Sequence, residues 1–278
     1  MKHQQRSTDE AEEETGRVPF PVGTAIHIPK GDETVVYKSH PVFAAPEDLG
    51  NKVWRYLDFS KFVFMLQTGS LYFTRIDCFD DPFEGSWPRK YVDSMNEFYR
   101  SAGVVRTLET KERGVWSIAR RKQMLASCWH LSDYESEAMW RLYLKTGEGI
   151  AIQSTFERLR DSLSCDERVY IGKVKYIDYE TDLFDDNNPM AAAMHKRRSF
   201  EHEREVRALI YQSHNADGTP RRFDHGLRVC VDLKVLIEKV FIAPVCPPWI
   251  KELVEGVIAR YGYGFHVEQS SLGAPPFM

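Results

Sequence analysis

The chain has 278 residues, of which 42% are hydrophobic, and this is enough for a sizeable core in one large domain or two small ones. Its formal net charge of -4 does not indicate nucleic acid as an obligatory partner, although local basic patches are compatible with it. No stretch approaches the roughly 18 apolar residues of a membrane span, the first residues lack the apolar core of a signal peptide, and the five cysteines form no Cys-x-x-Cys pair. We therefore expect a cytoplasmic protein with no membrane partner, disulfide framework or zinc knuckle.

The chain divides by composition into three parts. Residues 1–17 are polar and acidic and almost free of large apolar side chains, so we expect a disordered tail. Residues 18–47 carry several prolines and predict an extended arm that lies on the domain. Residues 48–278 are expected to form a single domain.

The stretch from Trp54 to Gly85 combines several elements. Val53–Leu57 predicts a strand, Asp58 offers a helix N-cap, and the helical spacing that follows stops at Gly69. Leu71–Arg75 alternates as a strand does, and an acidic turn ends it at Asp80, Asp81, Pro82 and Gly85. Loops at strand ends often carry chemistry, so this turn belongs to the candidate site.

The rest of the chain mixes helices and strands, and two capping-box patterns, Ser132 with Glu135 and Ser154 with Glu157, each predict a helix start. The predicted helices are Tyr91–Ala102, Leu108–Leu125, the two segments after these patterns, Met190–Phe200 and Pro248–Arg260. The predicted strands are Ala126–Leu131, Gly149–Gln153, Val174–Tyr179, Val206–Tyr211, Arg228–Leu233, Lys239–Ala243 and Phe265–Glu268.

The order of these elements predicts the fold class. Several of about eight short strands follow one another without an intervening helix, which favours a mixed sheet over a doubly wound parallel one. We therefore expect an α+β single domain with a mixed, largely antiparallel, twisted sheet flanked by helices. No glycine-rich phosphate-binding loop is visible.

Three clusters of polar and aromatic residues could carry chemistry. The first joins Arg55 and Tyr56 to the acidic turn, the second is the segment 127–130 (Ser-Cys-Trp-His), and the third contains Glu203, Glu205 and Arg207. In an extended chain the third cluster projects to one face, because strand side chains repeat every two residues. In a helix, Glu203 and Arg207 would instead form an i,i+4 ion pair worth only about 0.3 to 0.5 kcal/mol.

These clusters resemble the motifs of the mostly bacterial family called domain of unknown function 2971, in the family's order and over roughly Val53 to Leu272. The resemblance rests on Trp54-Arg55-Tyr56, Leu71–Arg75 and the turn at 80–84, on Cys128-Trp129 with Trp140, Tyr143 and Gly149–Ile152, and on Lys196, Glu203-x-Glu205-x-Arg207 and Val240–Ala243. The chain departs from the family at Asp80, where Asn is usual, and at His130, where Ser is usual. The resemblance implies a fold group, since the family's activity is unsettled.

The order of the clusters is also similar to that of mono-ADP-ribosyltransferase-like folds, which hold NAD with an early strand Arg, a mid-chain strand with Ser or an aromatic, and a late Glu-x-Glu. By this analogy Arg55, with Tyr56 beside it, would bind the pyrophosphate, because a guanidinium fork matches two phosphate oxygens. Trp129 or Tyr143 would stack on the nicotinamide. Glu205, or else Glu203, would bond a ribose hydroxyl and stabilise an oxocarbenium-like transition state.

Structural roles are the simplest alternatives for the same residues. Arg55 could pair with Asp81 or Glu84 within its own segment, and the central aromatics could belong to the core. Cys128 has no visible base and fits a buried small hydrophobe better than a nucleophile.

Two other classes of function stay open. Asp81, Glu84, His130, Glu203 and Glu205 could together hold Mg²⁺ or Mn²⁺ in a metal-dependent hydrolase or nuclease, although no ligand spacing demands it. A non-catalytic sensor or binding module of a bacterial defence or toxin system would use the same polar residues only to hold the fold.

Overall fold

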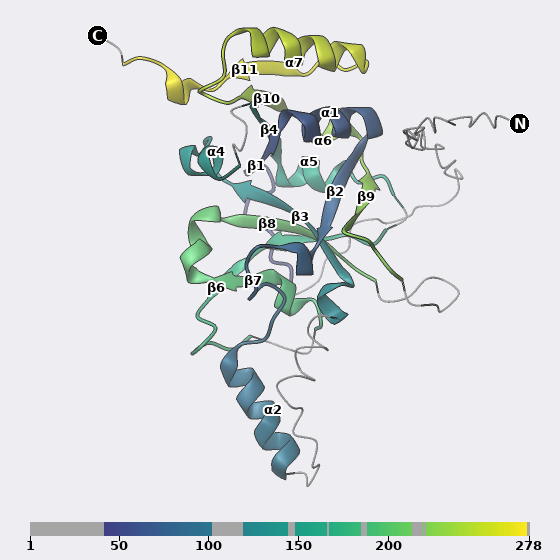
Figure 1. Ribbon diagram of the computed structural model, residues 1–278, viewed down its shortest axis with the longest axis vertical. Helices are drawn as coiled ribbons and strands as arrows, with labels where there is room; N and C mark the ends of the chain where they lie inside the picture. Colours follow the sequence, from purple (N-terminus) through teal and green to yellow (C-terminus); the bar gives the residue numbers. More distant parts are fainter. Residues whose placement is uncertain are drawn as a thin grey trace, which may run out of the picture. The chain divides into compact units, whose positions relative to one another are not determined.

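The computed structural model describes residues 42–101, 119–143, 148–165, 167–184, 188–212, 219 and 221–276, all within one compact unit (Figure 1). They form an α+β fold with a mixed, mostly antiparallel sheet flanked by helices, which confirms the predicted fold class. The predicted tail, most of the predicted arm and most of the helix predicted at Leu108–Leu125 lie outside the described residues. Within the described ranges, no helix is long and apolar enough to cross a membrane.

The main sheet has nine strands, and its path of hydrogen-bonded neighbours runs β11-β10-β4-β1-β3-β2-β9, with β8 pairing to β3 and β5. Its strands are β1 (Lys52–Asp58), β2 (Ser70–Arg75), β3 (Met124–Leu131), β4 (Gly149–Thr155), β5 (Tyr170–Lys173), β8 (Glu205–Tyr211), β9 (Gly226–Cys230), β10 (Lys239–Ile242) and β11 (His266–Gln269). Strands β10 and β11 pair in parallel. A second, two-stranded parallel sheet consists of β6 (Lys175–Ile177) and β7 (His195–Arg197).

The described α-helices are α1 (Phe59–Thr68), α2 (Arg89–Ser101), α4 (Glu137–Tyr143), α5 (Phe156–Asp161), α6 (Leu233–Leu236) and α7 (Trp249–Arg260). Short 3₁₀ turns are η1 (Ile76–Cys78), η2 (Ala191–Met194), η3 (Arg198–Glu203) and η4 (Ser271–Gly273). Helix α1 ends as predicted at Gly69, whose φ of 57° lies in the left-handed region and whose N–H bonds Met65 O. Asp58 occupies the predicted N-cap position but makes no capping bond with its side chain.

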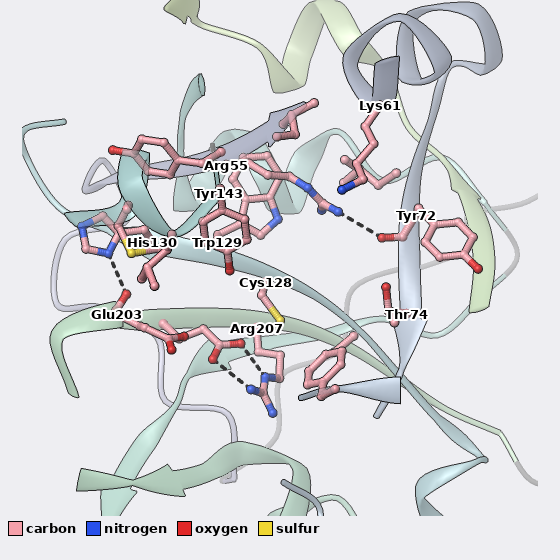
Figure 2. A pocket seen from close by; sticks show the side chains of 18 of the residues that line it. Arg55, Lys61, Tyr72, Thr74, Cys128, Trp129, His130, Tyr143, Glu203 and Arg207 are labelled. Atoms are coloured by element: carbon pink, nitrogen blue, oxygen red, sulfur yellow. Dashed lines mark hydrogen bonds and ion pairs between the residues drawn. The ribbon is translucent and has the colours of Figure 1, made fainter. Parts of the chain in front are cut away.

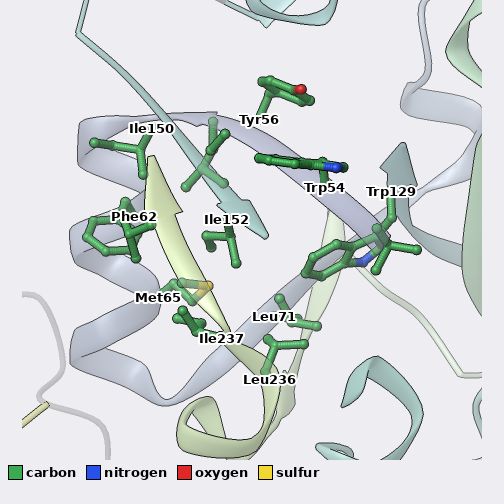
Figure 3. Close-up of a cluster of buried hydrophobic side chains, with 14 of the residues drawn as sticks. Trp54, Tyr56, Phe62, Met65, Leu71, Trp129, Ile150, Ile152, Leu236 and Ile237 are labelled. Carbon is green, nitrogen blue, oxygen red and sulfur yellow. The ribbon is translucent and has the colours of Figure 1, made fainter. Parts of the chain in front are cut away.

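The main core lies under α1, where helical spacing places one apolar face on the sheet. Phe62, Met65 and Leu66 of α1 are buried, and they belong to one cluster with Trp129 of β3 and Ile152 of β4 (Figure 3). Burying a side chain of this size stabilises the fold by about 1.5 to 3 kcal/mol. This packing fixes the β1–α1–β2 unit, from which several site residues project.

Strands β1 and β2 diverge where they meet β3. The described pairing of β1 with β3 covers Val53↔Leu131 and Trp54↔His130, at one end of β3. That of β2 with β3 covers Thr74↔Ala126 and Arg75↔Leu125, at the other end. Ser127, Cys128 and Trp129 therefore face a gap in the ladder, although on its other edge β3 pairs with β8 from Met124 to His130. At this point β1 and β2 separate from each other, and α1 connects the two strands (Figure 1).

Met190–Phe200 does not form the predicted helix. The segment is instead the turn η2, the strand β7 and the start of η3. Its alanines and methionines favour helix locally, but Ala191–Met194 are buried and the following strand pairs with β6. Tertiary contacts therefore outweigh local helix propensity here.

Both capping-box predictions are wrong, the one at Ser154 by one residue and the one at Ser132 by four. Thr155, not Ser154, caps α5 by accepting a hydrogen bond from Arg158 N at 3.1 Å, because Ser154 is still inside β4. Helix α4 begins only at Glu137, and Glu135 accepts a bond from Trp140 Nε1 at 3.1 Å instead of capping a turn.

Other predicted boundaries also move. Strand β3 begins at Met124, inside the predicted helix Leu108–Leu125. The strand predicted at Arg228–Leu233 ends at Cys230. The strand predicted at Val174–Tyr179 shrinks to β6, and the sequence interpretation missed β5.

Two glycines allow a matched test of this backbone. Gly256 lies inside α7, and apart from the adjoining backbone of this helix no atom of the described residues lies within 4 Å of the place that an alanine methyl would occupy. Gly256→Ala should therefore raise the free energy of unfolding by about 0.5 to 1 kcal/mol. Gly69 has equal space but a positive φ, so Gly69→Ala should lower it by about 1 kcal/mol. Urea denaturation measures both, and equal effects of the same sign would contradict the assigned backbone conformations.

Candidate functional site

A cleft of about 740 Å³ opens where β1 and β2 diverge over β3 (Figure 2). Its lining comes from β1, α1 and β2 on one side, α4 on another, and β3, β8, β7 and η3 at the base. The residues to which the sequence analysis assigns a catalytic or NAD-binding role all line it: Arg55, Tyr56, Trp129, Tyr143, Glu203 and Glu205. The three clusters, far apart in the sequence, therefore meet in one cleft.

Arg55 fills the gap between the diverging strands. Its guanidinium donates to Ser127 Oγ and, at 3.1 Å, to the carbonyl of Tyr72, and it lies 5.6 Å from the centre of the Trp129 ring. Among the described residues no carboxylate forms an ion pair with it. Burial lowers the pKa of the Arg55 guanidinium, because the water it loses is not replaced by a negative partner.

The alternative that Arg55 pairs with Asp81 or Glu84 is wrong, because both acids bond other cations. Asp81 Oδ1 lies 2.9 Å from Arg197 Nη2. Glu84 Oε2 lies 2.6 Å from Arg207 Nη2, and its Oε1 lies 3.2 Å from the Lys196 ammonium. Asp81 and Glu84 thus bind cations at the base of the cleft, and neither forms an ion pair with Arg55.

Arg207 organises the base of the cleft. It is fully buried on β8, opposite Cys128 of β3, and donates from Nε and Nη2 to both oxygens of Glu205 at 2.7 and 2.9 Å. Its Nη1 donates to the Ala193 carbonyl at 2.6 Å. Burial alone would raise the pKa of the Glu205 carboxyl, but the charge and hydrogen bonds of Arg207 and the charge of Lys196 outweigh it, and that pKa is lowered. Glu205 is therefore an ionised, fully paired carboxylate.

Glu203 differs from Glu205 in its exposure, its partner and the direction of its pKa shift. It ends η3, its side chain is 15% exposed, and Lys196 Nζ lies 2.7 Å from its Oε2. Burial raises the pKa of the Glu203 carboxyl more than Lys196 lowers it. The helical Glu203–Arg207 pair considered above is wrong, because β8 begins at Glu205 and Arg207 bonds Glu205 and Glu84. Of the two predicted catalytic carboxylates, Glu203 is the more accessible from the cleft.

His130 and Cys128 lie beside this network on β3. His130 Nδ1 is 2.6 Å from the carbonyl of Glu203, and since a carbonyl only accepts, Nδ1 carries the proton (Figure 2). Burial lowers the pKa of His130, which favours the neutral ring. Burial also raises the pKa of the Cys128 thiol well above its usual value, so the thiol is a poor nucleophile.

The aromatic residues divide into structural and accessible ones. Tyr56 and Trp129 are 5% and 2% exposed; the Tyr56 hydroxyl accepts a bond from Ser136 N at 2.8 Å and Trp129 Nε1 donates to Ser127 Oγ at 3.2 Å. Tyr143 stacks on Tyr56 with ring centres 6.5 Å apart but is 42% exposed. Tyr143 is therefore the predicted aromatic with a face available to a ligand.

Two lysines of the cleft were not predicted as site residues. Lys196 lies on β7, 8% of its side chain is exposed, and it reaches Glu84, Glu203 and Glu205. Lys61 lies on α1 at the other end of the cleft, 70% exposed, with its Nζ 2.8 Å from Asp58. The sequence did offer a signal for Lys196, because it belongs to the motif that resembles the family of unknown function. Nothing in the sequence distinguishes Lys61 from other lysines on the surface of a helix.

The same residues do not suit a metal ion. Among the described ranges no group of three or more His, Cys, Asp or Glu side chains is placed to hold one. Glu84 and Glu205 direct their oxygens at Arg207 and Lys196, so cations of the chain already occupy the place of a metal. The metal-dependent alternative therefore lacks a donor set here.

A scan against protein-family models finds no matching family, and a search of curated proteins finds no match either. The resemblance to the family of unknown function stays a prediction.

Proposed function

We propose that this cleft binds NAD and promotes cleavage of the bond between nicotinamide and ribose, as an ADP-ribosyltransferase or NAD hydrolase does. The observation that carries the proposal is Arg55, a partly buried guanidinium that lines a large cleft without a carboxylate partner among the described residues. Buried charges are normally paired, so an unpaired one in a cleft indicates an anionic ligand.

The end of the cleft near Arg55 suits a pyrophosphate. Arg55 is held by Ser127 and Tyr72 with its planar fork fixed, and such a fork binds two phosphate oxygens at once. Lys61, whose exposed pair with Asp58 is worth only about 0 to 1 kcal/mol, points toward the same part of the cleft and can exchange that partner for phosphate (Figure 2). In this proposal Arg55 and Lys61 together bind the pyrophosphate.

The opposite end suits the ribose and its leaving group. Three carboxylates (Glu84, Glu203, Glu205) face two cations (Lys196, Arg207), so this cluster carries a net charge of 2 − 3 = −1. In the proposed reaction the bond between the ribose C1′ and the nicotinamide nitrogen breaks with its electron pair going to that nitrogen, and water or an acceptor nucleophile forms the new bond to C1′. The positive charge that develops on the ribose is stabilised by a nearby carboxylate.

We assign this role to Glu203 and not to Glu205. Both oxygens of Glu205 bond Arg207, and 4% of its side chain is exposed, so it has no free oxygen for a ribose hydroxyl. Glu203 lies at the cleft with Oε1 free of hydrogen bonds to the described residues. Tyr143 supplies an exposed ring face at this end, and a volume of about 740 Å³ lies within the range of about 300 to 1,000 Å³ typical of ligand pockets.

Thermal unfolding with NAD tests the proposal. At an NAD concentration about 100 times Kd, binding should add about 2.7 kcal/mol of stability, which raises Tm by roughly 5 to 10 °C. Arg55→Met should abolish that shift. It should leave the Tm of the ligand-free protein unchanged or higher, because the variant also removes a partly buried charge that has no negative partner among the described residues.

The matched control is Arg228→Met, an exposed arginine on β9 outside the cleft, which should keep the full shift. No NAD-induced shift in the unmodified protein would overturn the proposal. A shift without nicotinamide release would place the protein among NAD-binding sensors, which contradicts the proposed reaction and supports the non-catalytic alternative.

A further inference from the structure

The proposed function uses Lys196 only as one of the charges at the ribose end of the cleft. Its ammonium lies 2.7 Å from Glu203 Oε2, 3.2 Å from Glu84 Oε1 and 3.5 Å from Glu205 Oε2. The ring of Phe200 covers it, with its centre 4.8 Å from Nζ. A single lysine thus links the accessible carboxylate to both buried ones.

We propose that Lys196 is a positioning residue that holds Glu203 in its ionised form and fixes its orientation toward the cleft; this inference rests on the proposed function. Glu203 ends the 3₁₀ turn η3, and the next residue, Arg204, has a positive φ of 39°. The Glu203 backbone is held from the other side by His130, whose Nδ1 donates to its carbonyl at 2.6 Å. Its side chain has Lys196 as its hydrogen-bond partner among the described residues.

Arg207 does not perform this task, because its donors go to Glu205, Glu84 and the Ala193 carbonyl. The two cations therefore have separate roles. Arg207 neutralises Glu205 in the interior. Lys196 connects the buried carboxylates to Glu203 at the surface of the cleft and holds the Glu203 side chain in place.

The ionisation of Glu203 depends on every charged or titratable group that faces it. Among the described residues these are Lys196 on β7, Glu205 on β8, Glu84 in the acidic turn, Tyr143 on α4, Tyr176 on β6 and His130 on β3. Glu205 and Glu84 disfavour the charged form, as burial does, and Lys196 favours it. Removing Lys196 therefore raises the pKa of Glu203 further and leaves its side chain without its anchor.

The experiment compares Lys196→Met with Lys196→Arg and with the control Lys175→Met, an exposed lysine on the neighbouring strand β6. Nicotinamide release from NAD is measured against pH. We expect Lys196→Met to move the acid limb of the kcat profile to higher pH and to lower the plateau about tenfold or more. Lys196→Arg should keep the acid limb near its original pH and most of the plateau rate, and Lys175→Met should leave the limb and the plateau unchanged.

A readout without NAD separates this inference from the proposed function. The carboxyl carbon of Glu203, assigned by its loss in Glu203→Gln, is titrated by NMR in ligand-free protein, and Lys196→Met should titrate at higher pH than the unmodified protein. An unchanged titration overturns the role of Lys196 whether or not NAD is cleaved. If Lys196→Met does not fold, Lys196→Gln takes its place, and an acid limb at the original pH in that variant likewise overturns it.

Discussion

Arg207→Met is expected to lower the free energy of unfolding by about 3 to 5 kcal/mol, a large part of the roughly 5 to 15 kcal/mol that stabilises a typical domain. Methionine is a flexible, unbranched replacement for the aliphatic stem of the arginine only, so it leaves Glu205 and Glu84 as buried carboxylates without their closest cation. It also leaves the Ala193 carbonyl without its donor. Urea denaturation followed by circular dichroism measures the loss.

The control is Arg141→Met, whose 2.6 Å pair with Glu137 is exposed and should contribute no more than about 0.5 kcal/mol. Arg207→Met is destabilising because Glu205 and Glu84 stay charged without Arg207. Adding Glu205→Gln to Arg207→Met should therefore recover part of the lost free energy of unfolding. A single variant within about 1 kcal/mol of the unmodified protein would contradict the assigned role of Arg207 as the buried partner of two acids.

The pH dependence of this loss has a defined sign. Arg207 lowers the pKa of Glu205 below its usual 4.5, so the pair contributes stability above that pH and loses it as the pH falls through the lower folded value. In Arg207→Met this contribution is absent, and the buried carboxyl takes up a proton more readily. The deficit relative to the unmodified protein should therefore shrink as the pH is lowered from 7 toward 4.

The sequence predicts the β1–α1–β2 unit well because its signals are local. The apolar spacing of α1 and the stop at Gly69 need no knowledge of distant residues, and both occur where expected. Arg55 could be singled out in the same way, as a guanidinium between two large aromatics in a predicted strand. What the sequence could not decide was its partner, because that depends on how β2 diverges from β1 across β3.

One error in the prediction lies where charged residues from distant parts of the chain meet. Met190–Phe200 is helical by composition, but Lys196 must reach Glu84, which belongs to a turn far earlier in the chain. Arg207 likewise bonds Glu84, 123 positions away. No spacing rule connects such residues, so the sequence placed Glu203 and Glu205 together but could not tell which one the interior neutralises.

Glu203→Gln is expected to lower kcat for nicotinamide release by about 10²- to 10³-fold while changing the Kd for NAD by less than about threefold. Glutamine keeps the shape of the side chain and can still contact Lys196, but it carries no charge to stabilise the ribose as positive charge develops. The phosphate end at Arg55 is untouched, so binding persists and the loss is confined to the chemical step. Steady-state kinetics and calorimetric NAD titration separate the two effects.

The acid limb of the rate profile provides a second, independent expectation for this variant. Burial raises the pKa of Glu203, so in the unmodified protein activity should rise with pH through a value above the 4.5 usual for a glutamate. The residual activity of Glu203→Gln should lack that limb. Glu201→Gln, an exposed acid in the same turn, should keep both the rate and the limb. If Glu205→Gln, and not Glu203→Gln, removes the limb in a folded protein, the carboxylate paired with Arg207 is the catalytic one and our assignment is reversed.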